Sequence, residues 1–287
     1  MASPDPPPGL SPGGPFPPPP GPALSTEEAR DLHRARAILE HPGFLLRLAG
    51  LVPVEGLLRR LPERARRAVG DATRAALDRA LDLALRTLDF GRGGPASDWL
   101  HRGVVAASGA LGGAAGLAGL ALELPFSLTV MLRSIADHAR AEGEDLSGVA
   151  ARLECLAVLA YGSNSPGQGS ESAYLASRLS LGQAVVRASA FIAERGVAEA
   201  LGEQGAPALA QLVSRIAQRL SATVADKAAA QLVPVVGAVG GAALNTLFLR
   251  HYQEAAWAHF TVRRLERIHG AEAVEAAYRA APGVLRP

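Results

Sequence analysis

Aromatic residues are scarce in this chain: they make up 5% of its 287 residues, whereas hydrophobic residues together make up 48%. A core with so few rings must be built mainly from Ala, Leu and Val, which favours closely packed helices and disfavours an all-β fold. Lysine is scarcer still, because Lys227 is the one lysine and the other basic side chains are arginines. The net charge is only +2, and neither a basic face nor stacking aromatics are evident. We therefore expect no nucleic-acid binding.

The chain has only one cysteine, and it shows no secretory signal. Cys155 is the single cysteine, so no internal disulfide can form, and its place in the apolar run 155–161 suits a buried small residue in a reducing compartment. Residues 1–23 contain no apolar stretch of the kind that a secretory signal needs. The sequence predicts a cytoplasmic protein, with peripheral attachment at the inner face of the cell membrane as an extension of that prediction.

Proline divides the first third of the chain. Residues 1–24 are proline-rich, which predicts a disordered leader. Ser25 and Glu28 have capping-box spacing, so a helix should begin at Ser25 and run to about Glu40. A long amphipathic helix is expected over 62–89. We divide the chain into the leader, N-terminal amphipathic helices over 25–95 and a helical core over 96–287, with 25–287 forming one compact domain.

Two long segments lack charge altogether and are rich in glycine. Residues 104–122 and 228–249 contain no acidic or basic side chain. Each glycine costs a helix roughly 1 kcal/mol relative to alanine, so the repeats make sense where another backbone packs very closely. The expected helix-packing glycines are Gly109, Gly112, Gly113, Gly116, Gly119, Gly237, Gly240 and Gly241. We predict an all-α fold, a large multi-helix bundle with two central Gly/Ala-rich apolar helices.

Two interpretations of these uncharged segments remain open. Their length approaches that of a transmembrane helix, about 20 residues, but helices in the middle of a large bundle are also apolar all round. Glu123 ends the first segment and Asn245 lies within the second. Polar groups such as these are costly in lipid, which favours the buried core.

Proline, glycine and periodicity predict the remaining helices. We expect a helix from Pro125 to about Glu142, closed by Gly143, and a second one that is capped by Asp145 or Ser147 and ends at Gly162. Further helices are expected over 171–195, 207–220, 222–232 and 235–269, followed by a short helix at the end. No segment shows the alternation of a convincing strand.

Several charged or polar residues lie beside apolar helices and form a candidate polar cluster. These residues are Glu123, Arg133, Asp137, Arg178, Lys227 and Asn245. If they are buried they must find partners, and we favour a structural ion-pair network over a functional pocket.

Metal ligands are sparse. Glu266 and His269 have the Glu-x-x-His spacing of di-metal helical bundles, and His259 is a further weak candidate, but a second such motif is missing. We expect neither a metal nor a cofactor, and no residue is assigned a catalytic role.

Two separated stretches resemble the EcsC family. The first runs from Arg152 through the Gly/Ser-rich loop to Arg178, and the second from Lys227 to Glu266, including Pro234 and Asn245. The step Glu123-Leu124-Pro125 is similar to the family's more usual Asp-Leu-Pro. The family is named for a gene next to the ATPase and membrane subunits of a transporter, so the resemblance implies a link to an ABC transporter. It implies no catalytic residue.

Three functional hypotheses follow. The first is a non-enzymatic, membrane-associated accessory or regulatory protein, with membrane lipid or a membrane transporter as its partner. The second is an unrecognised helical-bundle hydrolase or metalloenzyme that uses the polar cluster around Glu123 and Arg133. The third is a protein whose glycine-rich helices insert into a membrane on a trigger.

Overall fold

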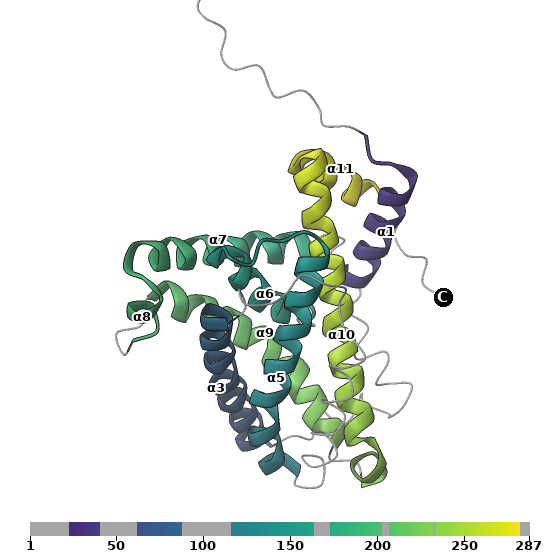
Figure 1. The fold of residues 1–287 in the computed structure, drawn as a ribbon. Coiled ribbons are helices and arrows are strands. Elements are labelled where there is room, and N and C mark those ends of the chain that lie inside the picture. The colour runs from purple at the N-terminus through teal and green to yellow at the C-terminus, as the bar shows by residue number, and fades with distance from the viewer. Residues whose placement is uncertain are drawn as a thin grey trace, which may run out of the picture.

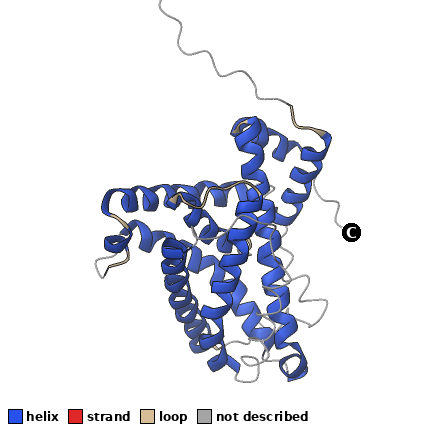
Figure 2. Cartoon of the chain, viewed as in Figure 1, coloured by secondary structure: helices blue, strands red, loops and turns tan. Residues whose placement is uncertain are grey.

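A computed structural model describes residues 23–40, 62–87, 116–163, 173–202, 207–231 and 234–281. These residues form nine α-helices and no strand, so the predicted all-α bundle is confirmed for them (Figure 2). The proline-rich leader and Gly109, Gly112 and Gly113 lie outside the described residues. Gly116, Gly119, Gly237, Gly240 and Gly241 lie within helices, but their surroundings are not described, so the expected close packing stays a prediction.

The N-terminal helices form as the sequence predicts. Helix α1 (Thr26–Glu40) begins with the expected capping box, in which the Ser25 amide donates to Glu28 Oε2 at 2.8 Å and the Glu28 amide donates to Ser25 Oγ at 3.2 Å. Helix α3 (Glu63–Thr87) packs against α5 and α9, whereas α1 packs against α10. Both helices therefore contribute to the same core as the rest of the described chain.

The predicted start of a helix at Pro125 is wrong, because helix α5 (Gly116–Ala141) passes through this proline. Leu124 and Leu128, on either side of the proline, are fully buried in one core, and this packing outweighs the missing backbone hydrogen bond. The helix ends as predicted, since Gly143 adopts a positive φ of 81° and the Glu144 amide reaches back to the Ala139 carbonyl at 2.9 Å.

Helix α6 (Val149–Tyr161) lies at the centre of the described structure. Every residue from Ala151 to Tyr161 is buried, and the helix contacts α3, α5, α7, α9 and α10. Its predicted end at Gly162 is confirmed. The predicted cap is wrong: Gly148 is the N-cap, and the Asp145 carboxylate instead accepts from the Ser147 amide at 2.9 Å, which makes a turn before the helix.

The remaining helices are α7 (Ala173–Arg195), α8 (Val197–Ala200), α9 (Pro207–Gln231), α10 (Pro234–His269) and α11 (Ala271–Ala280). The sequence predicts two helices where α9 is continuous. Leu220 and Val224 are both fully buried, so packing holds one axis across Ser221 and Ala222. Figure 1 shows α7 and the first part of α9 running side by side, with α8 at their far end, whereas the rest of α9 passes into the body and packs against α3 and α10. We call α7, α8 and the first part of α9 the α7–α9 lobe.

None of the helices within the described ranges is both long and apolar enough to cross a membrane.

Candidate functional site

The α7–α9 lobe has an unusual charge pattern. Acidic residues are absent from Ala173 to Ala193 on α7 and from Pro207 to Ala225 on α9, and the charged residues in these stretches are four arginines: Arg178, Arg187, Arg215 and Arg219. The acids Glu194 and Glu199 occur only at the tip, where both approach Arg195, at 3.8 Å and 3.0 Å. Between the tip and the body, these stretches of the lobe therefore contribute arginines and no acidic side chain, and one of the arginines, Arg178, is paired with Glu266 of α10.

Helix α7 is apolar on both faces. Its inner face is buried in the core through Leu181, Ala184, Val185 and Ala188. Its outer face is exposed before the last turn at Ala176, Leu179, Gln183, Val186, Arg187, Ala190 and Ala193, which we call the α7 stripe. Leu179 and Val186 are 68% and 65% exposed and, being seven residues apart, lie on one side of the helix. An exposed, nearly uncharged stripe on a packed helix is typical of a surface that meets a partner or a lipid phase.

A groove of about 760 Å³ runs beside the α7 stripe, between α7, the end of α10 and α11. Leu175, Leu179, Gly182 and Val186 of α7 form one wall, and Ala271 of α11 contributes to the opposite side. Its charged lining residues come from four helices: Glu154, Arg178, Arg187, Glu266, Glu275 and Arg279. We call this the α7–α11 groove.

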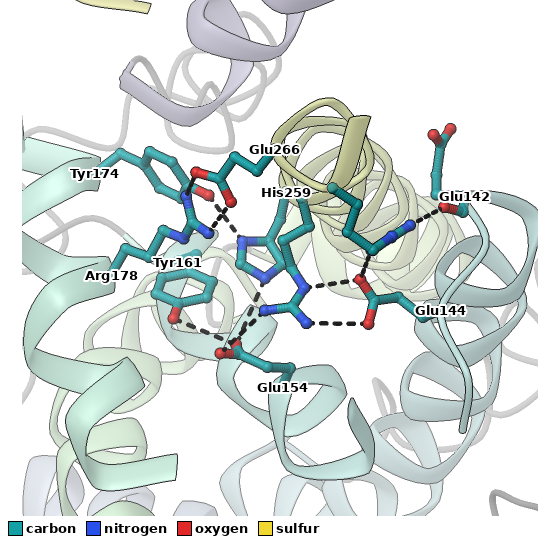
Figure 3. A network of polar contacts seen from close by, with 10 residues as sticks. Glu142, Glu144, Glu154, Tyr161, Tyr174, Arg178, His259 and Glu266 are labelled. Carbon is teal, nitrogen blue, oxygen red and sulfur yellow. Dashed lines mark hydrogen bonds and ion pairs between the residues drawn. The ribbon is translucent and has the colours of Figure 1, made fainter. Parts of the chain in front are cut away.

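A network of polar side chains forms the floor of the groove and joins α6, α7 and α10 (Figure 3). The two guanidinium nitrogens of Arg178 each lie 2.5 Å from an oxygen of Glu266. Deeper in, the Tyr174 hydroxyl lies 2.8 Å from His259 Nδ1, and the His259 ring stacks on Tyr161 with 4.6 Å between centroids. Because Arg178 and Tyr174 are one helical turn apart, both contacts fix the same face of α7 against α10.

Glu154 is the charged centre of this floor. One carboxylate oxygen lies 3.5 Å from both Tyr161 Oη and His259 Nε2, and the other lies 3.7 Å from an Arg263 nitrogen. Burial by itself would raise the pKa of Glu154, but His259, Arg263 and Arg178 bring this pKa below its ordinary value. The carboxylate is therefore ionised at neutral pH.

His259 is neutral in this setting. Burial lowers the pKa of its imidazole, and Glu154 opposes that change only in part. Burial also raises the pKa of Tyr174, so its phenol keeps its proton. An imidazole protonated on Nε2 fits both neighbours, because Nδ1 then accepts from Tyr174 and the Nε2–H faces Glu154. Tyr174 and His259 are 2% and 0% exposed, so a substrate cannot reach this pair.

The same network continues to the turn after α5. Arg263 donates to both oxygens of Glu144, at 2.8 and 3.0 Å, and Arg267 also pairs with Glu144. Arg264 Nε donates to Glu142 Oε2 at 2.7 Å. The acidic side chains near Glu154 are therefore paired with arginines, which is the arrangement of a structural ion-pair network. Of the predicted polar cluster, only Arg178 belongs to it.

A second buried ion pair joins the ends of the two uncharged segments. Lys227 Nζ lies 2.7 Å from Glu123 Oε1, and their side chains are 0% and 3% exposed. Burial lowers the pKa of Lys227 and by itself would raise that of Glu123; the Lys227 charge brings the pKa of Glu123 below its ordinary value. Ser127 Oγ donates to Glu123 at 3.0 Å, and Lys227 lies over the Phe248 ring at 4.9 Å. Asn245 is fully buried and stabilises the same carboxylate.

The predicted polar cluster is thus divided between different places. Glu123, Lys227 and Asn245 come together, whereas Arg178 belongs to the floor of the groove. Arg133 is exposed, and Asp137 pairs with Arg140 at 3.1 Å.

The three weak metal candidates also have separate neighbours. His259 contacts Tyr174, Glu266 binds Arg178, and His269 Nε2 lies 3.0 Å from Glu28. Among the described residues, no three His, Cys, Asp or Glu side chains are grouped as metal ligands.

Sequence reasoning missed the α7–α11 groove and the role of Glu154. A usable signal was present in α7, whose exposed positions before the last turn hold one charge, Arg187, where a solvated helix face normally holds several. Glu154 within a buried apolar helix was the second signal, because a buried carboxylate requires partners on other helices.

Comparison with known proteins gives one match. No curated protein and no solved structure matches the chain. The model of the EcsC protein family matches residues 82–265, which contain most of the helices that build the lobe, the groove and its polar floor. The chain therefore belongs to the EcsC family.

Proposed function

We propose that this protein is a non-enzymatic, membrane-associated accessory protein that attaches to an anionic membrane surface through its α7–α9 lobe. The α7 stripe carries the proposal. Leu179 and Val186 are exposed on a helix face whose single charge before the last turn is Arg187, and the surrounding stretches 173–193 and 207–225 contain arginines and no acidic residue.

Both parts of the surface suit a lipid headgroup region. Burying a leucine or valine side chain fully is worth about 1.5–3 kcal/mol. Each arginine close to an anionic leaflet adds about 1 kcal/mol, and this part falls with rising salt. Apolar and electrostatic contributions of this size together support reversible attachment rather than permanent anchoring.

The polar floor of the groove supports a non-enzymatic role. A general acid or base must approach the proton that it transfers to within hydrogen-bond distance. The Tyr174–His259 pair is the most enzyme-like contact in the described structure, and it is sealed inside the protein. Its geometry suits holding α7 in place. The link to a transporter that the family resemblance implies remains part of the proposal.

Flotation with lipid vesicles tests the proposal. We expect the protein to bind phosphatidylglycerol vesicles at low salt, to bind phosphatidylcholine vesicles weakly, and to dissociate as salt rises. Replacing both Leu179→Asp and Val186→Asp should weaken binding at least about tenfold, which corresponds to 1.4 kcal/mol.

The matched control is Ile268→Asp. Ile268 is 49% exposed, and it lies two residues after Glu266, on the side of α10 that faces away from α7. This variant should bind like the unmodified chain. Equal binding by the Leu179/Val186 variant, or no binding of the unmodified chain to anionic vesicles, would contradict the proposal.

A further inference from the structure

The α7–α11 groove has the dimensions of a site for one hydrocarbon chain. Its volume of about 760 Å³ falls within the usual range of ligand pockets. Leu175, Leu179 and Val186 follow one another along its α7 wall. At 1.5 Å per residue, the wall from Leu175 to Val186 is about 16 Å long. Half of a bilayer's hydrocarbon core is roughly 15 Å thick, so an acyl chain has the same length.

Gly182 keeps the middle of this wall open. It lies between Leu179 and Val186 along the groove, and a Cβ added at this position would meet no atom within 4 Å. Glycine is a poorer helix former than alanine, and no close neighbour here requires a glycine. The open space above Gly182 belongs to the groove.

Charge indicates which head group the groove accepts. Glu266 is paired with Arg178 and Glu275 with Arg279, while Glu154 lies close to Arg263 and His259. Arg187 lines the groove as well, and it forms no ion pair with any of the residues that the structure describes. The carboxylates of the groove are thus compensated, and Arg187 adds one positive charge at the Val186 end. An anionic head group complements this charge.

We propose that the α7–α11 groove binds one single-chain anionic amphiphile, with its hydrocarbon chain along Leu175, Leu179 and Val186 and its head group at Arg187. This inference rests on the proposed function, because the same side of α7 is presented to the membrane. The proposed occupant is a free fatty acid; one acyl chain of a membrane phospholipid, the other source of the same chemistry, is an outcome that the competition below distinguishes.

Fluorescence titration with dansylaminoundecanoic acid tests the site in the full chain. We expect saturable binding at one site per chain. Gly182→Leu places an apolar side chain in the groove at a position where an added Cβ meets no atom within 4 Å, and it should weaken binding at least about tenfold. The matched control is Gly70→Leu, because Gly70 lies within α3 and an added Cβ there also meets nothing within 4 Å. This control should bind the probe unchanged, and a thermal melt of both variants checks that they fold.

Arg187→Glu provides a second test at an exposed residue. It should weaken binding of the anionic probe and leave binding of its uncharged methyl ester nearly unchanged. Competition by phosphatidylglycerol vesicles, compared with competition by micellar laurate, then distinguishes a membrane lipid from a free fatty acid as the source. Absence of saturable binding, or equal probe binding by Gly182→Leu and Gly70→Leu, would overturn the inference.

The two proposals fail separately. Gly182→Leu adds an apolar side chain to α7, so flotation with phosphatidylglycerol vesicles should persist even where probe binding is lost. Flotation without any saturable probe binding would leave membrane attachment standing and overturn the groove site. Probe binding without flotation would overturn membrane attachment and, with it, the phospholipid source of the amphiphile.

Discussion

At the scale of single residues, Asp226 is a buried carboxyl whose pKa is shifted by burial alone. It is 6% exposed on α9, and burial raises its pKa to about 7 from an ordinary value of 3.8. The Tyr252 hydroxyl is near, but that hydroxyl is engaged by Ser163 Oγ at 3.1 Å. The neighbouring Lys227 ammonium is occupied by Glu123. Asp226 therefore remains protonated to a much higher pH than an exposed aspartate does.

This burial predicts a specific pH dependence of stability. In the unfolded chain Asp226 ionises near pH 4, whereas in the folded chain it ionises near pH 7, so its contribution to stability falls as pH rises between these values. Asp226→Asn removes the ionisation and should raise the free energy of unfolding at pH 8 by on the order of 2 kcal/mol. Urea unfolding at pH 5 and pH 8 measures this gain. A gain that is equal at the two pH values would contradict the explanation.

At the scale of helices, the Glu123–Lys227 pair joins α5 to α9. Glu123 directly follows the first uncharged segment, and Lys227 directly precedes the second. Lys227→Met should lower the free energy of unfolding by about 3–5 kcal/mol, because it leaves a buried carboxylate without its cation. Adding Glu123→Gln should recover part of this loss, since a neutral amide is less costly to bury. Chemical denaturation of both variants provides the measurement. A Lys227→Met protein as stable as the unmodified one would show that the ion pair does not stabilise the contact between α5 and α9.

The sequence was most informative about where the helices begin and end. Capping and turn signals that act through the local backbone, such as Ser25 with Glu28 and the positive φ of Gly143, predicted helix ends correctly. The predicted helix ends at Pro125 and near Ser221 were wrong, because packing against helices that are distant in sequence keeps α5 and α9 continuous at these positions. The free energy that local helix propensity contributes is small compared with that gained by burying Leu124 or Leu220 fully.

The candidate site was less predictable than the helices. Charges beside apolar segments singled out Glu123 and Lys227, which pair with each other, and Arg178, which pairs with the partly buried Glu266. Which residues pair depends on how helices far apart in sequence come together, and periodicity carries no information about that. Glu154 meets His259 and Arg263 across such a contact. The exposure of Leu179 likewise depends on what α7 packs against, and a sequence pattern alone assigns that leucine to the core.

At the scale of the whole molecule, α7 extends away from α10 (Figure 1) and carries the α7 stripe, with Leu179 and Val186 exposed. The central claim is that this stripe lies within the lipid headgroup region when the protein is attached. Cys155, the single natural cysteine, is fully buried, so a cysteine introduced at the surface can be labelled selectively.

The most direct measurement is the depth of a nitroxide spin label attached at Leu179→Cys, compared with the same label at Ile268→Cys, in the presence of phosphatidylglycerol vesicles. We expect the label at position 179 to gain contact with dissolved oxygen and to lose contact with a water-soluble nickel complex, while the label at position 268 remains in water. Equal exposure of both labels to the nickel complex, with the protein bound to the vesicles, would contradict this expectation.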